Sequence, residues 1–484
     1  MKIVLINVSA RLSSDGSRLI SALLKRAGHR VMSVFLARPD PLYYQREEFE
    51  QLDELIRDCE LVMVAVYSSY AIRAIQVTEF VHKNYPGMNV IWGGPHCISV
   101  PELALRYADG VCFSEGDQVI IDLVNRMGSG IDYLSTPNMA FNRNGIRVVN
   151  NVLPPFSELG SLPYHDYVLE DHFLLDRKLR QMTKQDLKDR LAGYPYYIPI
   201  LYVLTSRGCP HQCAYCNNCR YVTMFGRNTI RLQTVDHVVD ELVYTLEFLD
   251  FVSFVGFGDD DFFVRPTNQL EDFAKQYKRR VGLPFGIAVS ANSYRTEKME
   301  ILLDSGLKAV QIGVQSGSQR ILDEVYNRKI KVSKTKMVVQ QAAHYYKKSK
   351  LDILVDFIID NPYETKQDII QTYLFLIDLP YQVKINMFFL AFFPGTPIYD
   401  RALADGIIEP YNEKAFRFYT RTNIRYQENY ETFLILLLRR VRQRVPMIKY
   451  FPKVFLRALG SYPLRIVASI LPRSVYAFLC KLVQ

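Results

Sequence analysis

Three closely spaced cysteines are the residues of this chain whose chemistry is easiest to infer. Cys209, Cys213 and Cys216 form a Cys-x3-Cys-x2-Cys pattern just after an apolar run over residues 198–204, which predicts a buried strand. A structural zinc ion usually takes four ligands, whereas a four-iron cluster held by three cysteines keeps one iron open. An iron–sulfur cluster is therefore the first hypothesis, and a zinc or plain structural site is the alternative. Cys219 is expected to be only a thiol of the loop, because a fourth ligand would close the open iron.

Two series of alternating apolar and amphipathic segments position this loop. Residues 1–150 predict a Rossmann-like open parallel sheet, because short apolar runs alternate with helical patterns. Its strands are expected over 2–7, 31–35, 61–66, 89–92 and 110–113, and its helices near 17–27, 49–58, 71–85, 101–107 and 118–127. A hairpin is expected over 137–149 around Asn144-Gly145. Residues 151–197 predict an irregular linker, in which Tyr164, His165 and Asp166 are expected to be packed rather than to face a substrate.

The second series, over residues 198–406, places the cysteines at the end of its first strand. Its strands are expected near 198–204, 251–257, 286–290, 309–314, 351–359 and 384–391, with helices near 234–249, 268–280, 296–305, 333–346 and 366–376. In barrels built this way the chemistry lies at the carboxyl ends of the strands. Polar or glycine-rich loops follow several of these strands, so the spacing predicts one site assembled from many loops.

Composition and charge limit the classes of function. The 484 residues are 49% hydrophobic and 23% charged, which indicates a globular chain of about three domains. Residues 432–484 carry ten Lys or Arg and no Asp or Glu, so the net charge of +9 lies entirely in this region. A local anionic partner is therefore expected, and nucleic acid is not. The first residues predict a strand rather than a signal peptide, and the cysteine pattern suits a reducing, cytoplasmic setting.

The loops after the strands of the second series carry motifs in a recognisable order. They are the cysteine pattern with Tyr215 before its last cysteine, Asp259-Asp260-Asp261-Phe262, Ser290-Ala291-Asn292, Gly313-Val314-Gln315-Ser316-Gly317-Ser318, Asp356 to Thr365, and Phe393-Pro394-Gly395-Thr396-Pro397. In these motifs the chain resembles the radical S-adenosylmethionine (SAM) enzymes. The resemblance implies a partial (β/α)6 barrel, a [4Fe-4S] cluster on the three cysteines, and SAM at the open iron. The SAM-binding residues that it implies are Tyr215, Asp260, Asp261, Ser290, Asn292, Gln315, Ser316, Gly317 and Asp356. Glycines of these motifs would admit the adenosyl group, and the Pro-Gly-Thr-Pro turn would shape the barrel mouth. Gln315 stands where the family usually has Glu, and Asn361 and Tyr363 depart from family glycines.

A second resemblance covers most of the first 130 residues. Gly93-Gly94-Pro95-His96, Pro101-Glu102, Asp109-Gly110-Val111 and Glu115-Gly116-Asp117 are similar to motifs of the cobalamin-binding domain that precedes many radical SAM barrels. The cobalamin-binding residues that it implies are Asn7, Tyr67, Ser68, Ser69, Gly93, Gly94, Pro95, His96, Glu115 and Gly116. The Asp-x-His-x-x-Gly signature is absent, so the cobalt is expected without a histidine from that motif. His96 would contact the corrin edge or orient its loop, and a Rossmann-like domain without cofactor is the alternative.

The C-terminal region, residues 407–484, predicts short basic and apolar helical segments broken by proline. These segments could lie at a membrane interface with their basic ends at anionic head groups, or they could pack on the rest of the protein. The sequence leaves both alternatives open. A peripheral position at the inner membrane surface is therefore one of two expectations for an otherwise cytoplasmic protein.

The resemblances imply an enzyme that uses a [4Fe-4S] cluster, SAM and methylcobalamin. The implied reaction is methylation of an unactivated carbon through a 5′-deoxyadenosyl radical. The aromatic and basic C-terminal region favours a hydrophobic substrate, such as a lipid, an isoprenoid or a tetrapyrrole. A reducing partner such as flavodoxin or ferredoxin would be needed. Cobalamin-dependent cyclisation or rearrangement is one alternative, and a non-catalytic iron–sulfur sensor is another.

Overall fold

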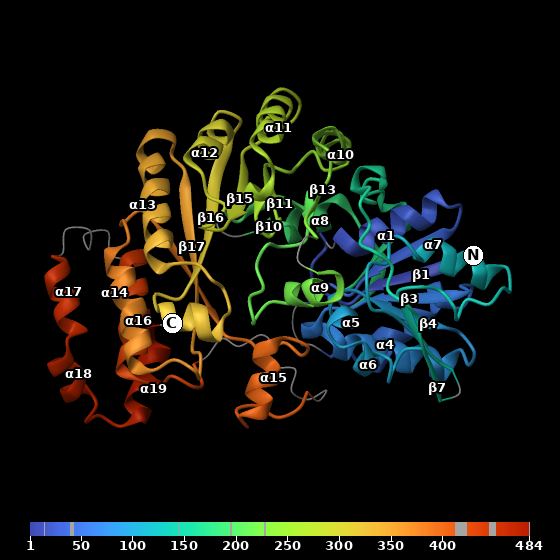
Figure 1. Cartoon of the computed structure of the whole chain (residues 1–484). Helices are drawn as coiled ribbons and strands as arrows, with labels where there is room; N and C mark the ends of the chain where they lie inside the picture. The colour runs from blue at the N-terminus through green and yellow to red at the C-terminus, as the bar shows by residue number, and fades with distance from the viewer. Residues whose placement is uncertain are drawn as a thin grey trace. The chain divides into compact units, whose positions relative to one another are not determined.

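The computed structural model describes residues 1–13, 15–38, 43–143, 145–193, 196–226, 229–411, 424–444 and 452–483. These residues fall into two compact units. The first consists mainly of Met1–Gly208 and Arg220–Gly256, and the second comprises Cys209–Cys219, Phe257–Pro410 and the described residues from 424 onward. The cysteine loop therefore belongs to the second unit. Figure 1 labels the elements along the chain.

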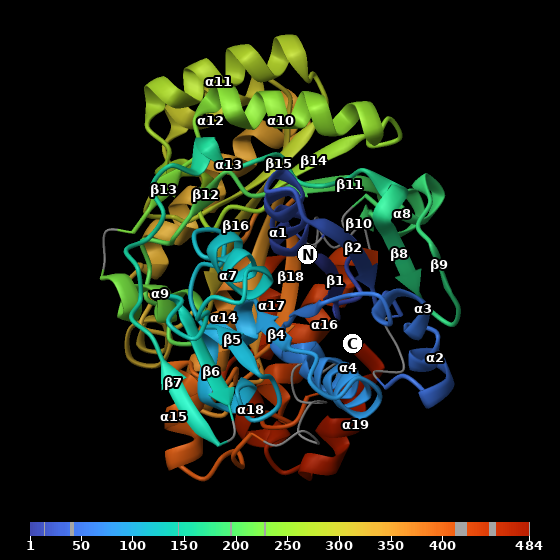
Figure 2. The same cartoon turned by 90° about the vertical axis from the view of Figure 1, so that its right-hand side faces the viewer.

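A nine-stranded sheet, with the strand order β7-β6-β5-β4-β3-β1-β2-β8-β9, organises the first unit (Figure 2). Its strands are β1 (Lys2–Asn7), β2 (Arg30–Phe35), β3 (Leu61–Ala65), β4 (Val90–Gly93), β5 (Gly110–Cys112), β6 (Met139–Arg143), β7 (Ile146–Val149), β8 (His172–Leu175) and β9 (Leu179–Gln181). In this order the strands from β5 across to β8 are parallel to one another, and β6, β7 and β9 extend the edges antiparallel. The predicted parallel sheet is confirmed.

Both faces of this sheet are buried, which explains why its strands are continuous apolar runs. Val4 and Ile6 enter one apolar core, while Ile3 and Leu5 enter the other. The helices of this part of the chain are α1 (Asp15–Arg26), α2 (Arg46–Glu50), α3 (Asp53–Ile56), α4 (Ala71–Asn84), α5 (Pro95–Ser99), α6 (Pro101–Ala104), α7 (Ile120–Gly128) and α8 (Lys184–Arg190). The expected helix near 49–58 is thus two short helices.

The prediction of an irregular linker over 151–197 is wrong for the second half of this segment. There β8 pairs in parallel with β2, and β9 and α8 follow. Strand β8 has only four residues, three of them apolar, which is too short to show a period in the sequence. The hairpin is confirmed by the pairing of Arg143 with Ile146, and Gly145 has a φ of +81°. Asn144, which the prediction placed in the turn, lies outside the described residues.

A seven-stranded sheet carries the six expected barrel strands in chain order, β10-β11-β14-β15-β16-β17-β18. The strands are β10 (Ala192–Gly193), β11 (Ile198–Val203), β14 (Phe254–Phe257), β15 (Phe285–Val289), β16 (Leu307–Gln315), β17 (Asp352–Ile359) and β18 (Lys384–Phe389). The intervening helices are α10 (Val235–Phe248), α11 (Thr267–Arg280), α12 (Thr296–Leu303), α13 (Val332–Ser349) and α14 (Lys366–Asp378). The strands β15 to β18 are parallel, and the first and last strands do not pair, so the predicted partial barrel is confirmed.

The described C-terminal residues are helical and pack on the second unit. Their helices are α16 (Tyr430–Arg444), α17 (Lys453–Leu459), α18 (Tyr462–Ala468) and α19 (Arg473–Val483). Helices α16 and α17 contact α14, and α19 contacts α16 (Figure 1). Within the described residues, no single helix has the length and apolar character needed to cross a membrane. The bent pair formed by α18 and α19 meets that test on length and composition.

Candidate functional site

The cysteine loop is held by backbone and side-chain bonds from two other loops of the second unit. The Ala214 N–H donates to the Tyr326 carbonyl at 2.8 Å, and the Ile398 N–H donates to the Ala214 carbonyl at 3.1 Å. The Asn327 amide adds a bond to the Gln212 carbonyl. Ile398 follows the Pro-Gly-Thr-Pro turn, so that turn fixes the cysteine loop directly. The three thiols therefore lie on a backbone whose position is set by distant parts of the chain.

The glycine before the first cysteine is required by the backbone. Gly208 has a φ of +90°, and a Cβ there would lie 2.6 Å from the Thr229 carbonyl oxygen. Any other residue would collide with that backbone and would adopt a left-handed conformation at a cost. Gly208 thus sets where the chain turns into the cysteine loop.

Burial makes the free thiols of this loop weak acids. Desolvation first, and then the charge of Asp260, raise the pKa values of Cys209 and Cys216 to about 12. The thiolates that would bind iron therefore need a neighbouring positive charge or the metal itself. Among the described residues, no three His, Cys, Asp or Glu side chains converge on a point as ligands of a single metal ion would.

Arg328 supplies a positive charge at this loop, and sequence reasoning missed it. Its guanidinium is 8% exposed and donates to the Tyr215 hydroxyl at 3.0 Å, to the Gly313 carbonyl at 3.1 Å and to the Cys213 Sγ at 3.5 Å. Its Nε atom is buried without a partner in the described structure. The only sequence signal was an arginine two residues after the aromatic Tyr326, which is weak.

The acidic loop after β14 divides its carboxylates between structural and open positions. Asp261 is 2% exposed; its Oδ1 accepts from the Phe263 N–H and from the Ser293 hydroxyl, so it caps the 3-10 turn Phe262–Val264. Asp260 is exposed to solvent. Desolvation by the surrounding protein raises the pKa of Asp260 to about 6, and repulsion from Asp259 and Asp261 adds to this effect. A hydrogen bond from Asn218 partly opposes the increase. The expectation that one of these carboxylates faces solvent or caps a helix is confirmed, and Asp260 is the one available to a ligand.

The loop after β15 carries Ser290 and Asn292, and the end of β16 carries Gln315. Ser290 is buried and accepts from the Asn292 N–H, while the Asn292 side-chain oxygen accepts from Lys334 at 3.2 Å. Gln315 ends β16 with a φ of +70°, next to a register shift between β16 and β17. A left-handed conformation is uncommon for Gln and turns its side chain out of the strand's alternation.

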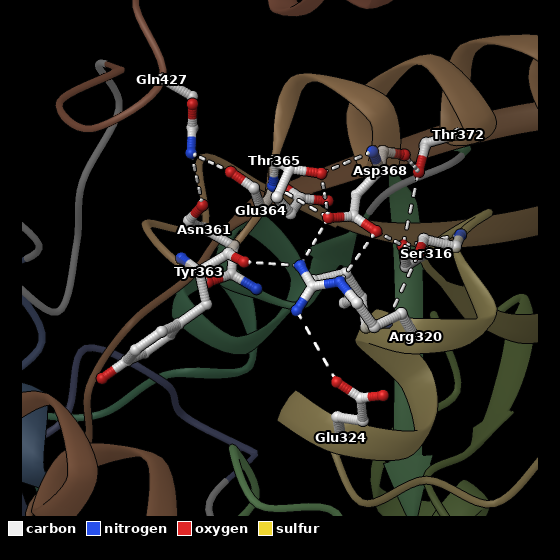
Figure 3. A network of polar contacts seen from close by, with 12 residues as sticks. Ser316, Arg320, Glu324, Asn361, Tyr363, Glu364, Thr365, Asp368, Thr372 and Gln427 are labelled. Carbon is white, nitrogen blue, oxygen red and sulfur yellow. Dashed lines mark hydrogen bonds and ion pairs between the residues drawn. The ribbon is translucent and has the colours of Figure 1, made fainter.

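Ser316 and Gly317 are packed against α14 instead of facing an open site (Figure 3). A Cβ on Gly317 would lie 2.6 Å from the Thr372 Cα. This glycine therefore makes room for a helix backbone, and its assignment to SAM stays a prediction. Ser316 is fully buried, and its hydroxyl lies 3.4 Å from that of Thr372.

A polar network around Asp368 joins the loops after β16 and β17 (Figure 3). Arg320 contacts the Asp368 carboxylate at 2.5 Å and donates to the Tyr363 carbonyl. Gln427 donates to the Asn361 and Glu364 carbonyls, each at 2.9 Å. Asn361 and Tyr363, which depart from family glycines, thus contribute mainly backbone groups to this network.

Asp356 lies inside β17 rather than at its end. Its carboxylate accepts from Gln311 at 2.6 Å and from Asn386 at 2.9 Å, which are residues of the two neighbouring strands. Desolvation raises the pKa of Asp356 despite these bonds. Its assignment to SAM stays a prediction.

The first unit contains a cavity of about 360 Å³ at the carboxyl ends of its parallel strands. The predicted cobalamin-binding residues in its lining are Tyr67, Gly93, Gly94, Pro95, Glu115 and Gly116. A Cβ on Gly93 would meet only the Cys112 Cβ, at 3.8 Å, so this glycine leaves room at the cavity. A Cβ on Gly94 would lie 2.9 Å from the Val66 carbonyl oxygen, so Gly94 serves the packing of two loops.

Four predicted residues lie outside the cavity lining. They are Asn7, Ser68, Ser69 and His96. The His96 ring is 2% exposed, with its Nδ1 3.1 Å from the Ser68 hydroxyl, and burial lowers its pKa to about 4. This contact joins the loops after β3 and β4. It is consistent with the alternative in which His96 orients its loop and does not contact the corrin. Asn7 is also buried, donating to the Ser17 hydroxyl.

Glu115, in the lining of the cavity, is held by a bidentate ion pair. Arg231 contacts its two oxygens at 2.7 and 2.8 Å, and Arg207 contacts Glu115 at 3.6 Å and Asp117 at 2.8 Å. Burial would raise the pKa of Glu115, but the two arginines outweigh it and hold that pKa below its ordinary value. The loop after β5 is therefore fixed by residues that flank the cysteine loop in sequence.

His165 lines the same cavity, contrary to its expected role as a packed linker residue. Its ring Nδ1 lies 2.6 Å from the Glu241 Oε1, and the backbone N–H of His165 donates to the same oxygen at 2.8 Å. Asp166, by contrast, is packed as expected, in an ion pair with Lys25 at 3.0 Å. A carboxylate that fixes one ring nitrogen commonly orients the other toward a ligand.

Comparison with known families adds a decisive match. The model of the radical SAM superfamily matches residues 203–376, which contain the cysteine loop and the strands from β14 to β17. Residues 203–376 therefore form a radical SAM domain. The family predicted from the cysteine pattern is confirmed.

Curated relatives match most of the length of this chain. A protein of Pyrococcus horikoshii described as an uncharacterised methyltransferase is 24% identical over 374 residues, which is 76% of this chain and 75% of the relative. The cytidylyl-2-hydroxyethylphosphonate methyltransferase of Streptomyces wedmorensis is 21% identical over 401 residues, 70% of each chain.

Solved structures share the two-part fold. TsrM of Kitasatospora setae, a radical SAM methyltransferase solved with tryptophan and a SAM analogue, aligns with a TM-score of 0.64 at 15% identity, covering 84% of this chain and 76% of TsrM. OxsB, a cobalamin-dependent SAM radical enzyme, aligns with a TM-score of 0.66 at 13% identity, covering 99% of this chain and 72% of OxsB. The expected succession of a Rossmann-like sheet and a partial barrel is therefore confirmed as a fold.

Proposed function

We propose that this protein is a cobalamin-dependent radical SAM enzyme that methylates an unactivated carbon of a hydrophobic substrate. The observation that carries the proposal is that one chain holds both the anchored three-cysteine loop and a cavity at the carboxyl edge of a parallel sheet. Relatives named as methyltransferases and a neighbour solved with cobalamin and a [4Fe-4S] cluster support it.

The residues of the cysteine loop fit an iron–sulfur cluster. Cys209, Cys213 and Cys216 offer three thiols on a backbone held in place by Tyr326 and Ile398. The buried guanidinium of Arg328 would compensate thiolate charge at Cys213. When bound, the cluster would supply the electron that cleaves SAM to methionine and a 5′-deoxyadenosyl radical.

Two charged groups are suited to hold the ends of SAM. The Arg328 guanidinium, with its unpartnered Nε, suits a carboxylate, and the accessible Asp260 carboxylate suits an ammonium group. Asn292 and Gln315 offer amides for the carboxylate and ribose, as the family resemblance implies. Tyr215, Asp261, Ser290, Ser316, Gly317 and Asp356 stay predicted SAM-binding residues, and in the structure they support the loops around the site.

The cavity of the first unit is suited to a large cofactor with an apolar body. Gly93 gives access to the backbone, Tyr67 and Pro95 add apolar surface, and Arg231 fixes Glu115 in the lining. When bound, methylcobalamin would supply the methyl group. The chain's own contribution would be to orient that cofactor and to exclude water from the reacting groups.

The reductant and the substrate are the finer parts of the proposal. Cleavage of SAM needs one electron, which a flavodoxin or ferredoxin would deliver. The apolar character of residues 452–483 supports a hydrophobic substrate, such as a lipid, an isoprenoid or a tetrapyrrole.

Two measurements test the proposed function. Reduced, reconstituted protein incubated with SAM should release 5′-deoxyadenosine, and Cys213→Ala should release none. Protein reconstituted with hydroxocobalamin should retain corrin absorption after gel filtration. Release of 5′-deoxyadenosine without any retained corrin would remove methyl transfer from the proposal, and absence of both would refute it.

A further inference from the structure

The last three helices carry their apolar side chains on the outside. Ile470 is 79% exposed, Tyr462 73%, Val454 65% and Val467 62%. Phe455, Leu459, Leu464, Ile466, Leu471, Phe478 and Leu482 are also among the exposed large apolar residues. Within residues 452–483, only Gly460, Tyr476 and Cys480 are buried. We call this outward layer of α17, α18 and α19 the apolar face.

These helices are held to the rest of the second unit by ion pairs and hydrogen bonds, together with the buried Tyr476 and Cys480 of α19. Arg457 pairs with Asp378 of α14 at 2.5 Å, Arg465 with Glu431 of α16 at 2.9 Å, and Arg473 with Glu428 at 2.8 Å. The Tyr373 hydroxyl donates to the Leu456 carbonyl, and the Tyr430 hydroxyl donates to the Leu459 carbonyl. A surface helix of a globular protein normally turns its apolar side inward. Here most of the large apolar side chains of α17, α18 and α19 are exposed instead, which leaves a large apolar surface in water.

Charge distinguishes among the surfaces that could cover the apolar face. Residues 452–483 contain five basic side chains and no acidic one. Three of the five are paired with acids of the second unit, and Lys453 and Lys481 remain exposed at the face. Two copies of a basic face would repel each other, whereas an anionic lipid surface would attract it. The bent pair α18 and α19 also has the length and apolar composition of a membrane segment.

We propose that the apolar face docks on an anionic lipid bilayer, with its side chains entering the boundary between head groups and acyl chains. The paired arginines hold the helices to the protein, so the apolar side chains supply the attachment and the two lysines supply only a preference for anionic lipid. This proposal goes beyond the proposed function and does not depend on any cofactor.

Vesicle binding of the full-length chain tests the proposal. The probes are vesicles of phosphatidylcholine alone and with roughly 30% phosphatidylglycerol. The test variant is Phe455→Ser with Val467→Ser and Ile470→Ser, and the control is Ile131→Ser with Ile146→Ser and Val149→Ser, which are equally exposed apolar residues of the first unit. The partition coefficient should fall by roughly 30-fold in the test variant, since each lost apolar side chain weakens insertion by about threefold or more. The control should bind like the wild type.

Further measurements separate the proposal from its competitors. Binding should remain measurable in about 1 M NaCl, because salt screens the lysines but not the apolar contact. Lys453→Glu with Lys481→Glu should abolish the preference for phosphatidylglycerol while keeping binding to phosphatidylcholine. Complete release at high salt would overturn the proposal in favour of electrostatic adsorption. A wild-type dimer that the test variant makes monomeric, with no vesicle binding, would overturn it in favour of a second copy.

Equal circular-dichroism melting curves for all variants establish that the fold is intact. If the serine variant does not fold, the lysine variant and the salt dependence of the wild type decide between lipid docking and electrostatic adsorption.

Discussion

Replacing Arg328 by Met should lower the reduction potential of the reconstituted cluster. The guanidinium lies 3.5 Å from the Cys213 Sγ and is 8% exposed, so solvent screens its charge poorly. If the centre of a bound cluster lay about 6 Å from the guanidinium, an effective dielectric constant of about 20 would let this charge stabilise the added electron by about 3 kcal/mol. That energy corresponds to a potential shift on the order of 120 mV for one electron. The positive charge favours the reduced state, so its loss lowers the potential.

The assay is a redox titration followed by electron paramagnetic resonance, without SAM. Arg328→Lys should keep most of the potential, because it retains the charge, but should not restore the bond to the Tyr215 hydroxyl. Arg401→Met removes an arginine of the same unit that is 47% exposed and pairs with Asp405, and it should leave the potential unchanged. An Arg328→Met protein with a full cluster and a potential within about 20 mV of the wild type would refute the electrostatic argument.

Three further predictions concern stability. Gly317→Ala should lower the free energy of unfolding by about 1–3 kcal/mol, because its Cβ would lie 2.6 Å from a backbone atom of α14; Gly16→Ala, where nothing lies within 4 Å, is the control in the same denaturant titration. Arg231→Met should cost about 3–5 kcal/mol by leaving the buried charge of Glu115 without its bidentate partner, and Glu115→Gln in that background should recover part of the loss. Desolvation, and after it the charges of nearby carboxylates, raise the pKa of Glu364 in the folded protein to about 8. Its neutral form therefore contributes its full share to the free energy of unfolding below the ordinary carboxyl pKa. That contribution is lost as the pH rises through 8. Glu364→Gln should therefore melt at a higher temperature than the wild type above pH 8 and at a similar temperature near pH 4.5. A difference in melting temperature that stays constant across this pH range would contradict the raised pKa of Glu364.

Local patterns predicted the elements of this protein well, because apolar periodicity depends on neighbours in sequence. The cysteine loop was predicted correctly at the end of its strand for the same reason. Strand β8 was missed because four residues, three of them apolar, carry no period, and its pairing with β2 is what marks it as a strand. Secondary structure that depends on a distant partner leaves little trace in the sequence around it.

The polar contacts of the site were less predictable. Arg328 reaches the cysteine loop from more than 100 residues away, and nothing near it in sequence marks that contact. The glycines were recognised, but Gly94 and Gly317 admit backbone from elsewhere in the chain. The basic C-terminal region was also misleading, because Arg457 and Arg465 are neutralised by acids that lie far from them in sequence. Charge counted along a segment says little about the charge left at its surface.

The ion pairs of Glu115 have a consequence for how this architecture can be recombined. Its partners Arg207 and Arg231 lie on either side of the cysteine loop in sequence, and both belong to the compact unit that contains the nine-stranded sheet. A chimaera that joined residues 1–150 to a foreign barrel would strand a buried carboxylate without its counter-ions. A graft of this sheet onto another barrel therefore has to carry Arg207 and Arg231 along with it.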